Sequence, residues 1–231
     1  MVDISPALYE QLSEAFYKRY NEDETIKKLL TERTSYANGN AYALRIGEIL
    51  GDLLANIGAG DLPEGRMYYN IAEKVVAPLM RNNYELVANF CDVIQKFLND
   101  KAGISFNPVK PTINEDRLLG ILDEIANALN YDEVKTRLPS QMANYSQNVV
   151  TDYVQTNAEY HYKAGLNPKI VRRLGYGGEA GTCKWCQRLA GVYDYADVQN
   201  AGNDVWRHHE DCFCSIEFIP SKTRGKYKRI Y

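Results

Sequence analysis

The sequence predicts a mainly α-helical (α+β) protein, in which an elongated helical body is followed by a small α+β module. Apolar residues recur at helical spacing through the first 165 of the 231 residues. Beyond residue 166 the pattern changes to short strand-like stretches, a glycine-rich loop and closely spaced cysteines. The composition, with 45% hydrophobic and 25% charged residues, is that of a folded globular protein and excludes disordered and fibrous classes.

The helical body begins with two short amphipathic helices between residues 6 and 33, which a polar break at 21–24 separates. A wide apolar stripe then covers 43–54 and stops at the glycines of the segment AlaAsnIleGlyAlaGly. We expect this stripe to mark a helix of the core.

A long periodic segment follows from Pro63 to Leu98, and we expect Pro78 to kink or split this helix because proline lacks a backbone donor. The stretch 107–112 is expected to be a linker. Further helices are expected to begin at Thr112 and near Ser140, the last of them continuing to about Tyr162.

The C-terminal part has a different texture. Residues 169–174 and 215–219 have strand character, and 175–181 reads as a flexible loop. We therefore expect a helical body at 1–166, a module with its own core at 167–220 and a tail at 221–231. Residues 1–165 carry 16 basic and 23 acidic side chains, whereas 166–231 carry 11 and 7, so the two parts differ in electrostatic character.

Membrane insertion and secretion are not expected. No stretch approaches the roughly 20 apolar residues that cross a bilayer, and the first 20 residues lack the basic and apolar regions of a signal peptide. Without a secreted context, closely spaced cysteines favour metal binding or reduced thiols over a disulfide framework.

Four of the five cysteines cluster between residues 183 and 214. The pattern is Cys183-x2-Cys186 followed by His209-x2-Cys212-x-Cys214, which offers thiolates and an imidazole in the two-plus-two arrangement that tetrahedral Zn²⁺ prefers. Five candidate donors compete for four positions, and the spacing leaves open which four bind. A closed site leaves no position for water, so we expect a structural zinc rather than a catalytic one.

The remaining cysteine, Cys91, lies in a helical pattern and is expected to be a small buried apolar group. A thioredoxin-like role for Cys183 and Cys186 is disfavoured because no βαβ unit precedes them. An HNH-like nuclease with His208 or His209 as base, dependent on zinc, is a further alternative. That fold requires a second metal-binding half, yet no His, Asn or Asp follows Cys214.

The C-terminal tail is strongly basic. Its cationic side chains, which we regard as candidates for contact with nucleic acid or an acidic partner, are Lys222, Arg224, Lys226, Lys228 and Arg229. Such a tail attracts phosphates without reading sequence. A solvated terminal segment is an equally good interpretation.

The run 178–193, followed by HisHisGluAspCysPheCys at 208–214, resembles the C-terminal module of phage Mu F-type minor head proteins. The matching positions are Cys183, Cys186, Leu189, Ala190, Gly191, His209, Cys212 and Cys214. The resemblance covers roughly residues 167–220. The sequence departs from the family at Glu210, where proline is frequent, and at Phe213, where a basic residue is frequent.

The resemblance implies a non-enzymatic minor capsid protein of a tailed phage or prophage, which acts in head morphogenesis or in DNA packaging and ejection. The partners that it implies are the portal, the major capsid protein or both, and packaged DNA is a further candidate. Several copies are expected in the virion, and assembly is expected in the host cytoplasm. We expect no catalytic residues, because no paired-carboxylate, Ser/His/Asp or phosphate-loop pattern is present. A host zinc-ribbon adaptor is the alternative without a phage context.

Overall fold

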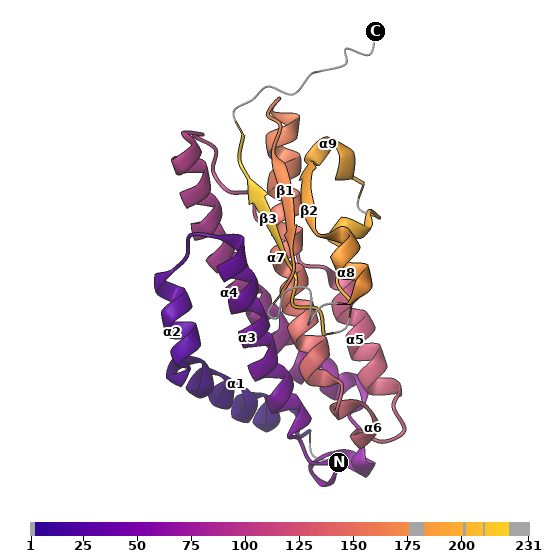
Figure 1. Cartoon of the computed structure of the whole chain (residues 1–231). Coiled ribbons are helices and arrows are strands. Elements are labelled where there is room, and N and C mark those ends of the chain that lie inside the picture. The colour runs from indigo at the N-terminus through magenta and orange to yellow at the C-terminus, as the bar shows by residue number, and fades with distance from the viewer. Residues whose placement is uncertain (1–2, 176–182, 201, 210, 222–231) are drawn as a thin grey trace.

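The computed structural model describes residues 3–175, 183–200, 202–209 and 211–221. As predicted, the protein is mainly α-helical with a small antiparallel sheet near the C-terminus. The long helices run lengthwise in an elongated body, and the sheet lies along one side of it (Figure 1). No helix within the described ranges is long and apolar enough to cross a membrane.

The first two helices, α1 (Ser5–Glu22) and α2 (Glu24–Thr31), meet at Asp23. The Asp23 carboxylate caps α2 by accepting a hydrogen bond from the Ile26 amide at 2.9 Å. It also pairs with the Arg45 guanidinium at 2.7 Å, which ties this corner to the next helix. Asp23 therefore ends α1 and caps α2, and it lies in the polar break that the sequence predicts at 21–24.

Helix α3 (Tyr36–Ala55) and the last long helix, α7 (Leu138–Lys163), form the closest helix pair of the body. Two glycines of α3, Gly47 and Gly51, face the backbone of α7. A Cβ atom at Gly47 would lie 2.5 Å from the Met142 carbonyl oxygen, so no larger residue fits there. Beyond α3, two short turns, η1 (Ala59–Asp61) and η2 (Pro63–Gly65), reverse the chain.

Helix α4 (Tyr69–Ala102) runs unbroken through Pro78. The expectation that Pro78 could split the segment is therefore wrong. Val75, Val76, Leu79 and Met80 are all buried on either side of the proline, so packing holds both halves in one helix despite the lost hydrogen bond. Gly103, with φ of 63°, ends the helix in the left-handed conformation.

The segment 104–114 leads to α5 (Glu115–Asn127), which begins at the Asn114 cap rather than at Thr112 as predicted. The Asn157 side chain of α7 bonds both the amide and the carbonyl of Val109, each at 2.9 Å, and so pins the linker to the body. The short helix α6 (Asp132–Lys135) precedes α7, which starts two residues before Ser140.

The sheet has the order β2-β1-β3, with both pairs antiparallel. Strand β1 (Lys169–Arg173) lies between β2 (Gly191–Asp194) and β3 (Ser215–Ile219), and Ile170 stands opposite Tyr193 and Phe218. Helix α8 (Lys184–Leu189) precedes β2, while α9 (Tyr195–Val198) and the turn η3 (Asp204–Trp206) follow it. Both strands expected from the sequence are confirmed.

One hydrophobic core runs through both parts of the chain. Ile170, Ile216, Phe218 and Trp206 belong to the same buried cluster as the residues of the helical body. The boundary expected after residue 166 therefore marks a change of secondary structure, but the expectation of a separate C-terminal core is wrong. The physical reason is that three short strands bury enough apolar area only when one face lies against α3 and α7.

Candidate metal centre

The first pair of candidate ligands lies at the start of α8. Cys183 is the N-cap of this helix, and its Sγ accepts a hydrogen bond from the Cys186 amide at 3.4 Å. Cys186, in the first turn, is fully buried, whereas Cys183 is exposed. The Cys-x2-Cys spacing thus becomes a helix start that turns both sulfurs to one side.

The second group of candidate ligands lies between η3 and β3. The Cys212 amide donates to the His209 carbonyl at 3.2 Å, and Asp211 adopts a positive φ of 55° within this turn. Helix α7 fixes the turn at both ends. Its Asn144 amide donates to the His209 carbonyl at 3.0 Å, and its Gln147 amide donates to the Cys214 carbonyl at 3.0 Å.

The two groups of candidate ligands meet at Cys186. Its Sγ lies 3.1 Å from His209 Nε2 and 3.8 Å from Cys212 Sγ, and Cys183 Sγ lies 3.3 Å from His209 Nε2. The ligand atoms of Cys183, Cys186 and His209 lie within 4.8 Å of one another, as do those of Cys186, Cys212 and Cys214. The cluster can therefore hold a metal ion.

The spacing within the cluster suits tetrahedral coordination. Two thiolates bound to Zn²⁺ at about 2.3 Å with a tetrahedral angle lie about 3.8 Å apart. The Cys186–Cys212 distance of 3.8 Å has this value. Such spacing exceeds the 2.05 Å of a disulfide, and all five cysteines are free thiols.

Arg172 of β1 is the charged side chain that faces this cluster from the sheet, and it is only 1% exposed. Its Nη1 donates to the carbonyls of Val205 and Arg207 at 2.7 and 2.8 Å. Its Nη2 lies 3.8 Å from Cys186 Sγ and 3.9 Å from Cys212 Sγ. Within the described ranges no carboxylate lies within ion-pair distance of it, so its polar neighbours are these two carbonyls and two sulfurs.

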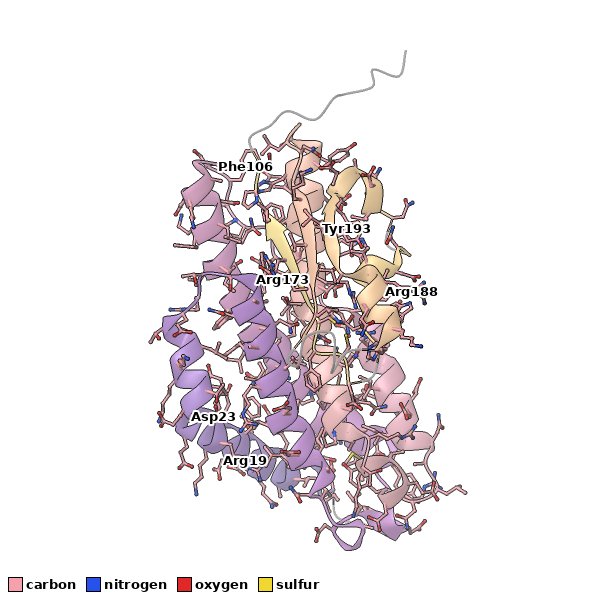
Figure 2. The ribbon with its side chains drawn as sticks, in the orientation of Figure 1. Arg19, Asp23, Phe106, Arg173, Arg188 and Tyr193 are labelled. Carbon is pink, nitrogen blue, oxygen red and sulfur yellow. The ribbon has the colours of Figure 1, made fainter. Side chains whose placement is uncertain are left out.

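The ring of Trp185 covers the guanidinium of Arg172, whose Cζ lies 5.3 Å from the ring centroid. Trp185 also stacks edge-on against His209, with centroids 5.9 Å apart. Arg188, further along α8, points away from the body in Figure 2 and takes no part in these contacts. Trp185, which lies between the two cysteines, therefore differs in role from Arg188 on the outer face of the helix.

The protonation of the thiols follows from their surroundings. The Cys186 amide, which donates to the sulfur, lowers the pKa of Cys183. Hydrogen bonds from the thiols of Cys212 and Cys186 lower the pKa of Cys214 to about 5, with Arg172 adding to the effect. Burial raises the pKa of Cys186 to about 11. A cationic metal favours the thiolate form of every sulfur that it binds.

The adjacent histidines diverge. His209 faces the thiols, while the Nε2 atom of His208 lies 2.9 Å from the hydroxyl of Thr151 on α7. Burial lowers the pKa of His208 to about 3, so its ring is neutral at pH 7. The geometry does not bring the two rings together as a catalytic pair and does not favour the nuclease alternative.

All five ligand candidates, Cys183, Cys186, His209, Cys212 and Cys214, converge on one place. Cys91 is buried in the core, as expected. The basic tail residues lie outside the described residues. Sequence reasoning missed Arg172, although period-two alternation along β1 places it on the same inward face as Ile170 and could have identified it.

Comparisons with family models, with curated proteins and with solved structures each found no match. The resemblance to phage Mu F-type proteins therefore stays a prediction from the Cys/His motif. What the fold and site establish is a mainly helical protein with a Cys/His cluster able to hold a metal ion.

Proposed function

We propose that the Cys/His cluster binds one structural Zn²⁺ ion and that the chain is a non-enzymatic minor head protein of a tailed phage or prophage. The observation that carries the metal assignment is the buried Arg172, which lies against two sulfur atoms and has no carboxylate within ion-pair distance in the described ranges. A buried guanidinium costs several kcal/mol unless it is compensated. Thiolates held by zinc supply that compensation.

The zinc would fasten two segments that are separate in the sequence. Helix α8 contributes Cys183 and Cys186, and the turn before β3 contributes His209, Cys212 and Cys214. Five donors surround four coordination positions, and Cys186 belongs to both groups of ligands. We therefore assign Cys186 to the metal. Which three of the other four donors complete the site is left to experiment.

The proposal of a head protein is supported by the motif. The cysteine and histidine positions that match the family motif are those that form the cluster, which supports a common architectural role for them. A closed metal site of four protein ligands offers no coordination position for a substrate. Its contribution is to stability, as expected for a protein that acts by assembly with the portal or the major capsid protein, in several copies, within the virion.

Metal analysis tests the zinc assignment. The full chain, purified without added metal or a histidine tag, should contain about one zinc per chain. If the four ligands are all cysteines, four thiols should react only after chelation. If His209 is one of the four ligands, three thiols should do so. Replacement of His209 by alanine separates the two sets, because the first keeps its metal and the second loses it. Disulfides without metal would overturn the assignment.

Analysis of phage particles tests the role. Particles purified from an induced lysogen that carries the gene should contain the chain at a fixed, low number relative to the major capsid protein. Deletion of the gene should leave particles that are defective in assembly or DNA content. Mature, infectious particles that lack the chain would contradict the proposal, whatever the metal content.

A further inference from the structure

A cavity outside the metal cluster lies between α5, the start of α7 and the segment that carries His208. Its volume is about 350 Å³, within the range of small-molecule sites. The residues that line it are Arg117, Ile121, Glu124, Arg137, Ser140, Gln141, Asn144, Tyr145 and His208. None of them is a candidate metal ligand.

Unpartnered polar atoms concentrate around this cavity. Among the described residues, Arg117 Nη1, Ser140 Oγ, the Tyr145 hydroxyl and His208 Nδ1 are buried and have no hydrogen-bond partner. Each such group costs about 1–3 kcal/mol when left unsatisfied. Four such groups on side chains that line one cavity indicate a polar occupant, toward which small side-chain rotations would turn them, rather than four separate packing defects.

The charge and chemistry of these groups point to the kind of occupant. A guanidinium and two hydroxyls are available as donors. The carboxylate of the cavity, Glu124, is already satisfied, because Oε1 pairs with Arg137 at 2.9 Å and Oε2 accepts from Gln141 at 2.5 Å. The unbalanced charge is therefore that of Arg117, which makes no ion pair within the described ranges.

The acidic side chain that acts on Arg117 is Asp152, which lies on α7 about two turns after Tyr145. Its charge favours the guanidinium form of Arg117, while burial opposes that form and lowers the pKa of Arg117. Asp152 forms no ion pair with Arg117 within 4 Å, and burial raises its own pKa to about 6. It therefore attenuates the positive charge of the cavity without cancelling it.

The cavity has a buried floor and a wet rim. The side chain of Tyr145 is 2% exposed, whereas those of Arg137 and Glu124 are 53% and 36% exposed. A small ligand can thus approach past the Arg137–Glu124 pair, and the donors beneath, which have almost no accessible surface, would rotate toward it. Asn144, which lines the cavity, also holds the His209 carbonyl, so an occupant would rest against the turn that carries the metal ligands.

We propose that this cavity binds a small oxyanion, the phosphate or carboxylate group of a small molecule, with Arg117 as its cationic contact and the hydroxyls of Tyr145 and Ser140 as donors. Ligand binding in this place bridges α5, α7 and the C-terminal module. The bound protein should therefore be more stable than the free one.

Titration calorimetry of the metal-loaded full chain with inorganic phosphate and with acetate, at pH 7 and constant ionic strength, tests the proposal. We expect saturable binding of at least one of them at one site per chain, with a rise in the thermal midpoint. The anion that binds with the lower dissociation constant shows whether the cavity prefers a phosphate or a carboxylate group. Absence of saturable binding of both anions would overturn the proposal.

Two variants locate the site. Arg117→Gln should weaken binding about tenfold or more, because it removes a charge-assisted contact. The matched control is Arg81→Gln, in which the arginine pairs with Glu115 and does not line the cavity. Equal weakening in both variants would show only nonspecific attraction and would refute the site.

Tyr145→Phe keeps the ring and removes only the hydroxyl, so it guards against loss of folding. We expect weaker anion binding by several-fold. If the variant becomes more stable and binds phosphate as before, the hydroxyl is a packing defect and the proposal fails. Asp152→Asn should act in the opposite direction and strengthen binding, because it removes the acid that attenuates Arg117.

Discussion

The helical body and the C-terminal module differ in the side chains that form their buried contacts. In the helical body, α3, α4 and α7 pack apolar side chains around closely approaching backbones, as at Gly47. In the C-terminal module, a second small cluster consists of three cysteines with Leu174 and Trp185 packed beside it. The comparison teaches that one continuous core can pass from close helix packing in one part of the chain to a cluster of thiols able to hold a metal ion in the other.

The difference also appears in how charge is treated. Ion pairs of the helical body, such as Arg81–Glu115 and Lys74–Asp3, lie at the surface, where each contributes little. Arg172 is instead buried, and its compensation comes from two carbonyls and two sulfurs. Figure 2 shows Arg173, its neighbour on β1, which pairs at 2.5 Å with Glu217 of β3 at the exposed side of the sheet.

The largest effect is expected from Cys186→Ser. This substitution removes the donor common to both ligand groups, so the metal should be lost and the free energy of unfolding should fall by several kcal/mol. Because the core is continuous, the thermal transition of the whole chain should move to lower temperature, rather than that of the C-terminal module alone. Metal analysis and far-UV circular dichroism measure the two effects.

The control for this prediction is Cys91→Ala, which changes a buried cysteine outside the cluster. It should keep its metal and lose about 1 kcal/mol for the small cavity. A Cys186→Ser protein with full metal content would contradict the assignment of this residue to the centre.

The next effect in size is expected from Arg172→Met. Removing a buried charge from its partners costs about 3 kcal/mol, and the thiolates lose the cation that stabilises their charge. Metal affinity, measured by competition with a chromogenic chelator, should fall about tenfold or more. The matched control, Arg173→Met, removes a 60% exposed arginine from the same strand and should change either quantity little.

Gly47→Ala should destabilise the helical body by about 3 kcal/mol, because the new methyl group would overlap the backbone of α7 at Met142 and Ala143. Gly60→Ala is the control, since a Cβ atom there meets no heavy atom of the structure within 4 Å. Chemical denaturation measures both. Equal stability of the two variants would show that α3 and α7 do not approach as described.

Asp152→Asn is expected to stabilise the protein at pH 7 by about 3 kcal/mol. Burial raises the pKa of Asp152 from 3.8 to about 6 in the folded state, so ionisation is harder there than in the unfolded chain. The native protein should therefore lose stability as pH rises from about 4 to 6 and remain lower above that range. In the variant this part of the pH dependence should vanish, whereas the exposed Asp123→Asn should retain it.

Much of the architecture was predictable because local patterns agree with tertiary packing. Apolar periodicity located the helices of the body, and the alternation at 215–219 located β3 with the bounds that the structure shows. The split considered at Pro78 does not occur, because burial on both sides of the proline offsets the missing hydrogen bond in α4, and a local pattern does not contain that burial. The start of α5 was misplaced because Asn114, not Thr112, makes the capping bond.

The candidate metal centre shows the same division. The sequence by itself determined the identity and spacing of the five donors, because thiols and imidazoles are the side chains that bind zinc and because a Cys-x2-Cys spacing fits a single turn. Only the tertiary structure decided that Arg172 lies against two of the sulfurs and that Asn144 and Gln147 of α7 hold the ligand-bearing turn. It also decided that the C-terminal sheet completes the helical core and that Arg117, Tyr145 and His208 line one cavity. Those contacts join residues tens of positions apart, and their energy comes from burial and pairing in three dimensions, which no local sequence pattern encodes.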